Sequence, residues 1–191
     1  MKQANFSNQQ IAISHNGRFD IYAIIHKALR RFMSDTLNAV GSMDGNDAQE
    51  VADGLAQLRA LTAFCFSHLQ HENAFVHAAM EQRRPGSTTA IAAEHTHHEW
   101  ALGQLEALAV AVEQSDGAAR SAAIAQLYRS LALFVAENLA HMNIEETEHN
   151  AVLWATHSDT EIIAIEQALV ASIPPAESLA TMRWMIPAMN A

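Results

Sequence analysis

Several residue types that mark other protein classes are scarce in this 191-residue chain. Only 7 glycines and 4 prolines are present, which disfavours a turn-rich β fold and favours long regular elements. The single cysteine, Cys65, cannot form an internal disulfide, and its flanking residues Phe64 and Phe66 indicate a packed thiol in a reducing compartment. No apolar run reaches the roughly 18 residues of a transmembrane helix, and residues 1–14 lack a signal-peptide pattern. We therefore expect a cytoplasmic protein without a membrane segment.

Positive charge is also scarce. Lysine and arginine number 11 against 21 aspartates and glutamates, which gives a formal charge of −10 and argues against nucleic-acid binding. In contrast, 50% of the residues are hydrophobic, enough for one domain with a substantial core. Histidine is unusually frequent, at 11 residues. Because neutral histidine serves as a metal ligand or proton carrier, this composition directs attention to the histidines.

Apolar residues recur at helical spacing in four long segments, at about residues 19–40, 47–84, 88–114 and 118–156. Their short connections predict an all-α, up-down-up-down four-helix bundle over 19–156. Residues 1–18 are polar and predict an N-terminal arm. Residues 157–191 predict two extra C-terminal helical segments that pack on the bundle, the second stopped by Pro187.

Two sequence signals mark helix starts inside this scheme. Asp47 with Glu50, and Ser158 with Glu161, have the spacing of a capping box. Between the second and third long segments, Pro85 and Gly86 predict a helix end and a turn.

A repeated pattern of histidine and glutamate lies within the apolar stripes. His68 precedes Glu72 by four residues, and His141 precedes Glu145 in the same way, with an offset of 73 residues between the copies. The spacing of four places each pair on one helix face. Adding the same offset to His26 gives position 99, next to two further histidines at 95 and 98. Buried imidazoles and carboxylates are costly unless they are paired or bind a metal.

This residue set suits two adjacent metal ions. Two carboxylates can each bridge a pair of ions about 3.5–4 Å apart, while neutral imidazoles bind the outer sides. Imidazole and carboxylate ligands without thiolate favour iron, and manganese or zinc less so.

The order of these residues resembles the hemerythrin-like (HHE cation-binding) family. The segments His141–Glu146 and Arg183–Ala188 are also similar to bacterial members. The resemblance implies an oxo- or hydroxo-bridged pair of non-haem irons with Glu72 and Glu145 as bridges. It implies histidine ligands from the set His26, His68, His95, His98 and His141.

The third long segment departs from the pattern of the oxygen-carrying members. Those have His-x-x-x-His there, whereas His95 is followed by Glu99, and His98 is the alternative ligand on the same face. If only one of His95 and His98 binds, each iron is one ligand short of octahedral. Such a centre should favour reaction with peroxide or nitric oxide over reversible oxygen carriage.

The remaining histidines receive separate interpretations. His71, His77 and His97 lie off the apolar stripe and are expected to be solvent-exposed, while His149 is either close to the site or on the surface. Tyr22, one turn before His26, is interpreted as a packing aromatic.

A ferritin-like di-iron bundle is the main structural alternative. Glu94-x-x-His97 and Glu146-x-x-His149 match its Glu-x-x-His spacing. The first long segment contains no glutamate, however, and this alternative leaves His26, His68 and His141 without a role. We therefore favour the hemerythrin-like arrangement.

The sequence thus predicts a di-iron protein that binds dioxygen or senses dioxygen or nitric oxide. A redox enzyme that consumes peroxide or nitric oxide, with an external electron donor, is the alternative. An iron-handling protein is a third hypothesis.

Overall fold

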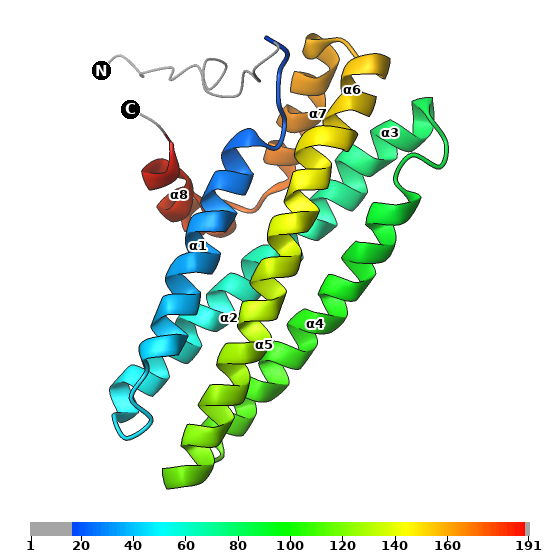
Figure 1. Ribbon diagram of the computed structural model, residues 1–191. Helices are drawn as coiled ribbons and strands as arrows, with labels where there is room; N and C mark the ends of the chain where they lie inside the picture. Colours follow the sequence, from blue (N-terminus) through cyan, green and yellow to red (C-terminus); the bar gives the residue numbers. More distant parts are fainter. Residues whose placement is uncertain (1–16, 190–191) are drawn as a thin grey trace, which may run out of the picture.

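The computed structural model describes residues 17–189, and this part of the chain is helical with no β-sheet (Figure 1). The first long helix is α1, Ala23–Ser42. The second long segment is continuous from α2 (Ala48–His71) through the π-helical turn η2 (Glu72–His77) into α3 (Ala78–Arg83). The third is α4, Thr89–Glu113. The fourth runs from α5 (Gly117–Ile144) through the π-helical turn η3 (Glu145–His149) into α6 (Asn150–Thr156).

These four long segments lie side by side and alternate in direction (Figure 1). Helix α1 packs against α2 and α5, and α4 packs against the same two neighbours. Each segment therefore directs one face towards a shared interior, as its apolar periodicity requires. The predicted limits of the four segments differ from the observed ones by a few residues at the ends.

The two predicted helix starts are observed, with one difference in their hydrogen bonds. Asp47 accepts hydrogen bonds from the backbone of Gln49 and Glu50, but the Glu50 carboxylate binds the backbone N–H of Asp44 instead of completing a capping box. At the later start, Ser158 and Glu161 form both halves of the box.

Two apolar clusters fill the interior along the length of the helices. The large cluster spans the end of the molecule where α1 turns into α2 and α4 into α5. It includes Leu29, Met33, Leu55, Leu58, Leu61, Leu105, Leu127 and Leu131, all at most 2% exposed. The small cluster lies towards the opposite end and consists of Phe19, Ile21, Tyr22, Ile24, Val76, Met80, Leu153 and Ile162. On α1 and on the second and fourth segments, the site residues lie between members of the two clusters.

Two further helices, α7 (Asp159–Ser172) and α8 (Pro175–Ala188), cover one side of the four long segments. Helix α7 contacts η2, and α8 packs against α1 (Figure 1). At this contact Trp184 stacks on Phe32 with ring centroids 3.8 Å apart. The prediction that Pro187 stops the last helix is wrong. Pro187 lies inside α8, which ends one residue later at Ala188.

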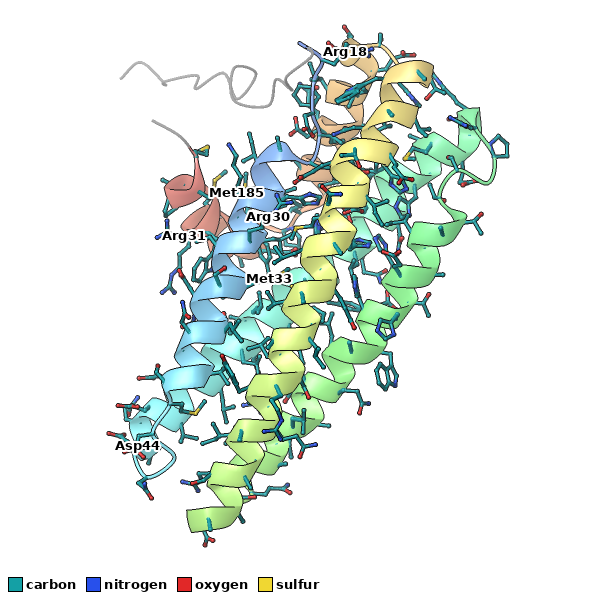
Figure 2. All side chains as sticks on the ribbon, viewed as in Figure 1. Arg18, Arg30, Arg31, Met33, Asp44 and Met185 are labelled. Atoms are coloured by element: carbon teal, nitrogen blue, oxygen red, sulfur yellow. The ribbon has the colours of Figure 1, made fainter. Side chains whose placement is uncertain are left out.

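Residues 1–16 of the predicted arm lie outside the described residues. Near the start of the described residues, Arg18 (labelled in Figure 2) connects the chain to the α6–α7 junction. Its guanidinium donates to the Asp159 carboxylate at 2.7 Å and to the carbonyl oxygens of Trp154 and His157.

Among the described residues, no single helix is both long enough and apolar enough to cross a membrane. Helices α7 and α8 meet that length and composition only when taken together, and they are bent by 120° at their junction.

Candidate metal centre

Four long segments bring histidines and glutamates to one level of the interior. His26 comes from α1, His95 from α4, and the two His-x-x-x-Glu pairs from the second and fourth segments. Each pair spans the junction between an α-helix and a π-helical turn, because η2 begins at Glu72 and η3 begins at Glu145. These side chains are buried, and His68, with a side chain 12% exposed, is the most open of the inner set.

One group of ligand atoms combines the first two segments with Glu145. His68 Nε2 lies 3.1 Å from Glu72 Oε1, and His26 Nε2 lies 3.7 Å from the same oxygen. His26 Nε2 is also 3.4 Å from Glu145 Oε2. One ligand atom from each of these residues falls within 4.8 Å of all the others.

A second group uses the other face of the same two carboxylates. His95 Nε2 is 3.6 Å from Glu72 Oε2 and 3.6 Å from Glu145 Oε1. His141 Nε2 lies 3.4 Å from Glu145 Oε2. Each glutamate thus directs its two oxygens towards different imidazoles, which is the arrangement of a bridging carboxylate between two ions.

The spacing of these atoms fits metal coordination. Two ligands about 2.0–2.1 Å from one ion, at angles near 90–110°, lie about 2.8–3.4 Å apart. The measured separations of 3.1 to 3.7 Å are close to that range. The same atoms make poor hydrogen bonds: His26 Nε2, His68 Nε2 and all four oxygens of Glu72 and Glu145 are buried without a hydrogen-bond partner. Buried polar atoms without partners are rare, so this convergence indicates a cation site.

The outer nitrogens of three histidines are held by surrounding acceptors. His26 Nδ1 donates to Glu146 at 3.0 Å, His95 Nδ1 to Asn73 at 2.8 Å, and His141 Nδ1 to Glu94 at 2.8 Å. Because the acceptors are carboxylate or amide oxygens, the proton belongs on Nδ1 and the Nε2 lone pair faces inward. These hydrogen bonds therefore orient the three rings so that each Nε2 atom can bind a metal.

The acceptor of His26 is itself fixed in place. Arg30 on α1 donates two hydrogen bonds to Glu146, at 2.6 and 2.9 Å (Arg30 is labelled in Figure 2). A bidentate guanidinium–carboxylate pair is well defined geometrically. It therefore holds the His26 ring through Glu146.

One contact between imidazoles is especially informative. His95 Nε2 and His141 Nε2 lie 3.1 Å apart, although their Nδ1 atoms already donate elsewhere. Two neutral rings in this tautomer would direct lone pairs at each other. A shared cation, either a proton or a metal ion, resolves that conflict.

The members of the site differ in the direction of their pKa shifts. Burial disfavours the charged form of His26, but the hydrogen bond to Glu146 and the nearby charges of Glu145 and Glu72 raise its pKa to about 9. Burial and the neighbouring Glu145 raise the pKa of the Glu72 carboxyl to about 7. Burial together with nearby histidines lowers the pKa of His68. Protons thus occupy part of the site in the metal-free protein.

The prediction that His77 is solvent-exposed is wrong. His77 is 5% exposed and stacks on His95 with ring centroids 4.8 Å apart. At about 100° per residue, His77 would lie about 140° around an α-helix from Glu72. The π-helical turn η2, Glu72–His77, is closed by i to i+5 bonding and returns His77 to the same side.

His149 joins His77 beside Glu145. It is 4% exposed, and the two imidazoles and the carboxylate offer ligand atoms within 4.8 Å of one another. His149 Nδ1 also lies 3.5 Å from the hydroxyl of Tyr22. Of the two interpretations left open for His149, the structure therefore supports the buried position near the site. Tyr22 is 1% exposed and packs in the small apolar cluster, and its ring also stacks on His26.

His98 takes a different place from the other predicted ligands. Its ring packs edgewise on His141, with centroids 4.7 Å apart, and it contributes no atom to the three ligand groups among the described residues. His97 is exposed, as predicted, and reaches Glu137 on α5. His71, predicted to be exposed, is half-buried beside Ser67.

Two cavities approach the centre from different sides. The larger, of about 510 Å³, lies between α1, α2, α7 and α8 and reaches His68 and Glu72. The smaller, of about 310 Å³, is more polar and reaches His149 and Glu94 beside the α3–α4 turn. The centre is therefore enclosed, but it has a cavity beside His68 and Glu72 and another beside His149 and Glu94.

Comparison with protein families, curated proteins and solved structures gives no match for this chain. The functional argument therefore rests on the geometry of the site.

Proposed function

We propose that this chain is a non-haem di-iron protein that binds dioxygen, or senses dioxygen or nitric oxide, at a carboxylate-bridged centre. The observation that carries the proposal is the convergence of unpartnered inner nitrogens and carboxylate oxygens, with three outer Nδ1 atoms held by acceptors. The arrangement of the long helices fits a hemerythrin-like four-helix bundle with two extra C-terminal helices.

The residues divide naturally between two ions. His26 and His68 would hold one and His95 and His141 the other, with Glu72 and Glu145 shared. The absence of thiolate near the site favours iron over zinc, and manganese remains compatible with the ligand set. When bound, a pair of irons supplies reversible electron transfer to a small oxidant.

The π-helical turns supply the imidazoles that the third long segment lacks. His77 and His149 flank Glu145, whereas Glu99 points outwards to bond Gln70 at 2.6 Å. We infer that His77 or His149, and not His98, completes the ligand set. Replacing His77 by alanine should therefore lower iron retention, whereas replacing His98 should leave the iron count unchanged.

A redox enzyme that consumes peroxide or nitric oxide is the second candidate. The cavity of about 510 Å³ beside His68 and Glu72 is compatible with it, because the cavity leaves space for a small oxidant next to the centre. An electron donor from outside the chain would then be required for turnover. Iron handling remains a third hypothesis, which no contact in the described residues specifically favours.

The decisive experiment loads metal-free protein with ferrous ion under anaerobic conditions and then follows oxygen with an electrode. Oxygen uptake in proportion to bound iron, reversed by argon, supports the binding function. Sustained removal of peroxide or nitric oxide with an electron donor supports the enzyme. Failure to retain about two irons per chain would overturn both.

A further inference from the structure

The larger cavity has the dimensions of a binding site for an organic molecule. Its volume of about 510 Å³ lies within the range typical of small-ligand pockets. One wall comes from α1 and α2, and the other from α7 and α8, which lie against them (Figure 1). Met185 on α8, labelled in Figure 2, contributes to this lining.

Most of the lining is apolar, and it connects directly to the candidate metal centre. Aliphatic and aromatic side chains dominate, among them Phe19, Ile25, Phe64, Leu169 and Met182. His68 and Glu72 form the inner end. His68 is also the inner histidine with the most open side chain, which identifies this side as the approach to the centre.

The charged groups of the cavity all have the same sign. Glu166 on α7 and Glu177 on α8 line it with Glu72, and the lining contains no lysine or arginine. Glu177 accepts a hydrogen bond from Ser67. Glu166 has no hydrogen-bond or ion-pair partner among the described residues, and burial raises the pKa of its carboxyl. A carboxyl in such surroundings is stabilised by a cation.

We propose that this cavity binds a small organic amine whose apolar body fills the space between the helices and whose ammonium group pairs with Glu166 or Glu177. A molecule bound here lies next to His68 and Glu72. Its role as a substrate or regulator of the centre rests on the proposed di-iron function. An organic acid of the same length is excluded, because its carboxylate would face three acidic side chains without a compensating charge.

Binding of n-octylamine to the full chain tests the proposal, measured by titration calorimetry beside n-octanol and n-octanoate. Metal-free protein is titrated first, so that coordination of the amine by iron cannot contribute. The amine should bind at least about tenfold more tightly than the alcohol, since a charge-assisted hydrogen bond contributes this much. Octanoate should bind more weakly than either.

Variants locate the site. Glu166→Gln and Glu177→Gln together should reduce the preference for amine over alcohol by about tenfold or more. Glu137→Gln, an exposed carboxylate on α5, is the matched control and should change nothing. Thr181→Trp on α8 fills the cavity and should abolish binding of all three probes. Thermal unfolding of each variant checks that it is folded.

Three outcomes would overturn the proposal: no binding of octylamine, equal binding of amine and carboxylate, or unchanged selectivity in the Glu166→Gln/Glu177→Gln variant. Iron retention is counted separately on the same preparations. Octylamine binding without iron retention would remove the proposed di-iron function and leave the amine site intact. Iron retention without octylamine binding would do the opposite.

Discussion

The large apolar cluster and the candidate metal centre are built from the same long helices, but their buried atoms are satisfied differently. Around the large apolar cluster the helices are regular, and Leu58, Leu127 and Leu131 are completely buried among other aliphatic side chains. Around the centre the second and fourth segments contain π-helical turns, and buried nitrogens and oxygens lack partners.

This difference indicates that the large apolar cluster and the centre serve separate purposes. Burial of apolar side chains stabilises the fold at the large cluster. The unpartnered groups of the centre destabilise the metal-free fold, since desolvated carboxylates and imidazoles lose their water contacts. Together these groups could hold a metal ion, which would compensate for the lost water contacts.

The largest expected effect follows from removing a shared carboxylate. Glu145→Gln should abolish retention of both ions, because Glu145 contributes to every ligand group among the described residues. The stabilisation by metal, about 4 kcal/mol at a concentration a thousandfold above Kd, should disappear with it. Metal analysis and thermal unfolding with and without ferrous ion measure both effects.

Glu148→Gln, in the same π-helical turn but exposed, is the control for that change. It should retain both ions. Full retention of iron by Glu145→Gln would remove the assignment of this residue as a bridge.

The next effect should appear in the large apolar cluster. Leu127→Ala leaves a cavity in the large cluster and should lower the free energy of unfolding by about 2–5 kcal/mol, with and without metal alike. Leu133→Ala on the same helix, where the side chain is 66% exposed, should have little effect. Denaturant unfolding and an iron count test this pair. A loss of bound iron from folded Leu127→Ala protein would show that the large cluster and the centre are not independent.

A smaller effect is expected from changing the hydrogen-bond acceptor of a candidate histidine ligand. Glu94→Gln weakens the hydrogen bond that orients His141 and should reduce metal affinity by about 10- to 100-fold. Glu99→Gln changes a carboxylate on the same helix that accepts a hydrogen bond from Gln70, and it should leave affinity unchanged. Competition with a chelator of known affinity provides the measurement. Equal affinities for the two variants would contradict the orienting role.

The smallest effect is a difference in pH dependence. In the metal-free protein, burial opposes charge on His26 and His141, but their carboxylate partners raise the pKa values to about 9 and about 8, above the usual 6.5. Their stabilising contribution is complete below pH 6.5 and is lost as pH rises through those values. Metal binding requires deprotonated ligands and strengthens over the same range. The unfolding midpoints with and without metal should therefore move apart between about pH 6.5 and about pH 9, and parallel curves would contradict this.

The apolar periodicity of the sequence was sufficient to predict the helices and most of the residues that line the centre. His68, Glu72, His141 and Glu145 lie on the apolar face at a spacing of four, and the structure places them in the interior together with His26. Helix limits followed from apolar stripes and from signals such as Ser158, although Pro187 did not end its helix.

Departures from α-helical geometry could not be predicted from the apolar periodicity. A period of 3.6 residues directs His77 outwards, and only the π-helical turn reverses that. His95 and His98 share a face, so their spacing could not decide which of them turns its nitrogen inwards. Glu94 and Glu146 matched a ferritin-like spacing in the sequence, but in the structure they accept hydrogen bonds from His141 and His26.

The central claim is that buried imidazoles and two shared carboxylates hold a pair of metal ions. Anaerobic titration of the metal-free full chain with ferrous ion, followed by removal of loose metal and elemental analysis, tests it most directly. The account predicts about two irons per chain in the native sequence and none in a variant with both Glu72→Gln and Glu145→Gln. Absence of retained iron in the native protein, or equal retention in the double variant, would contradict it.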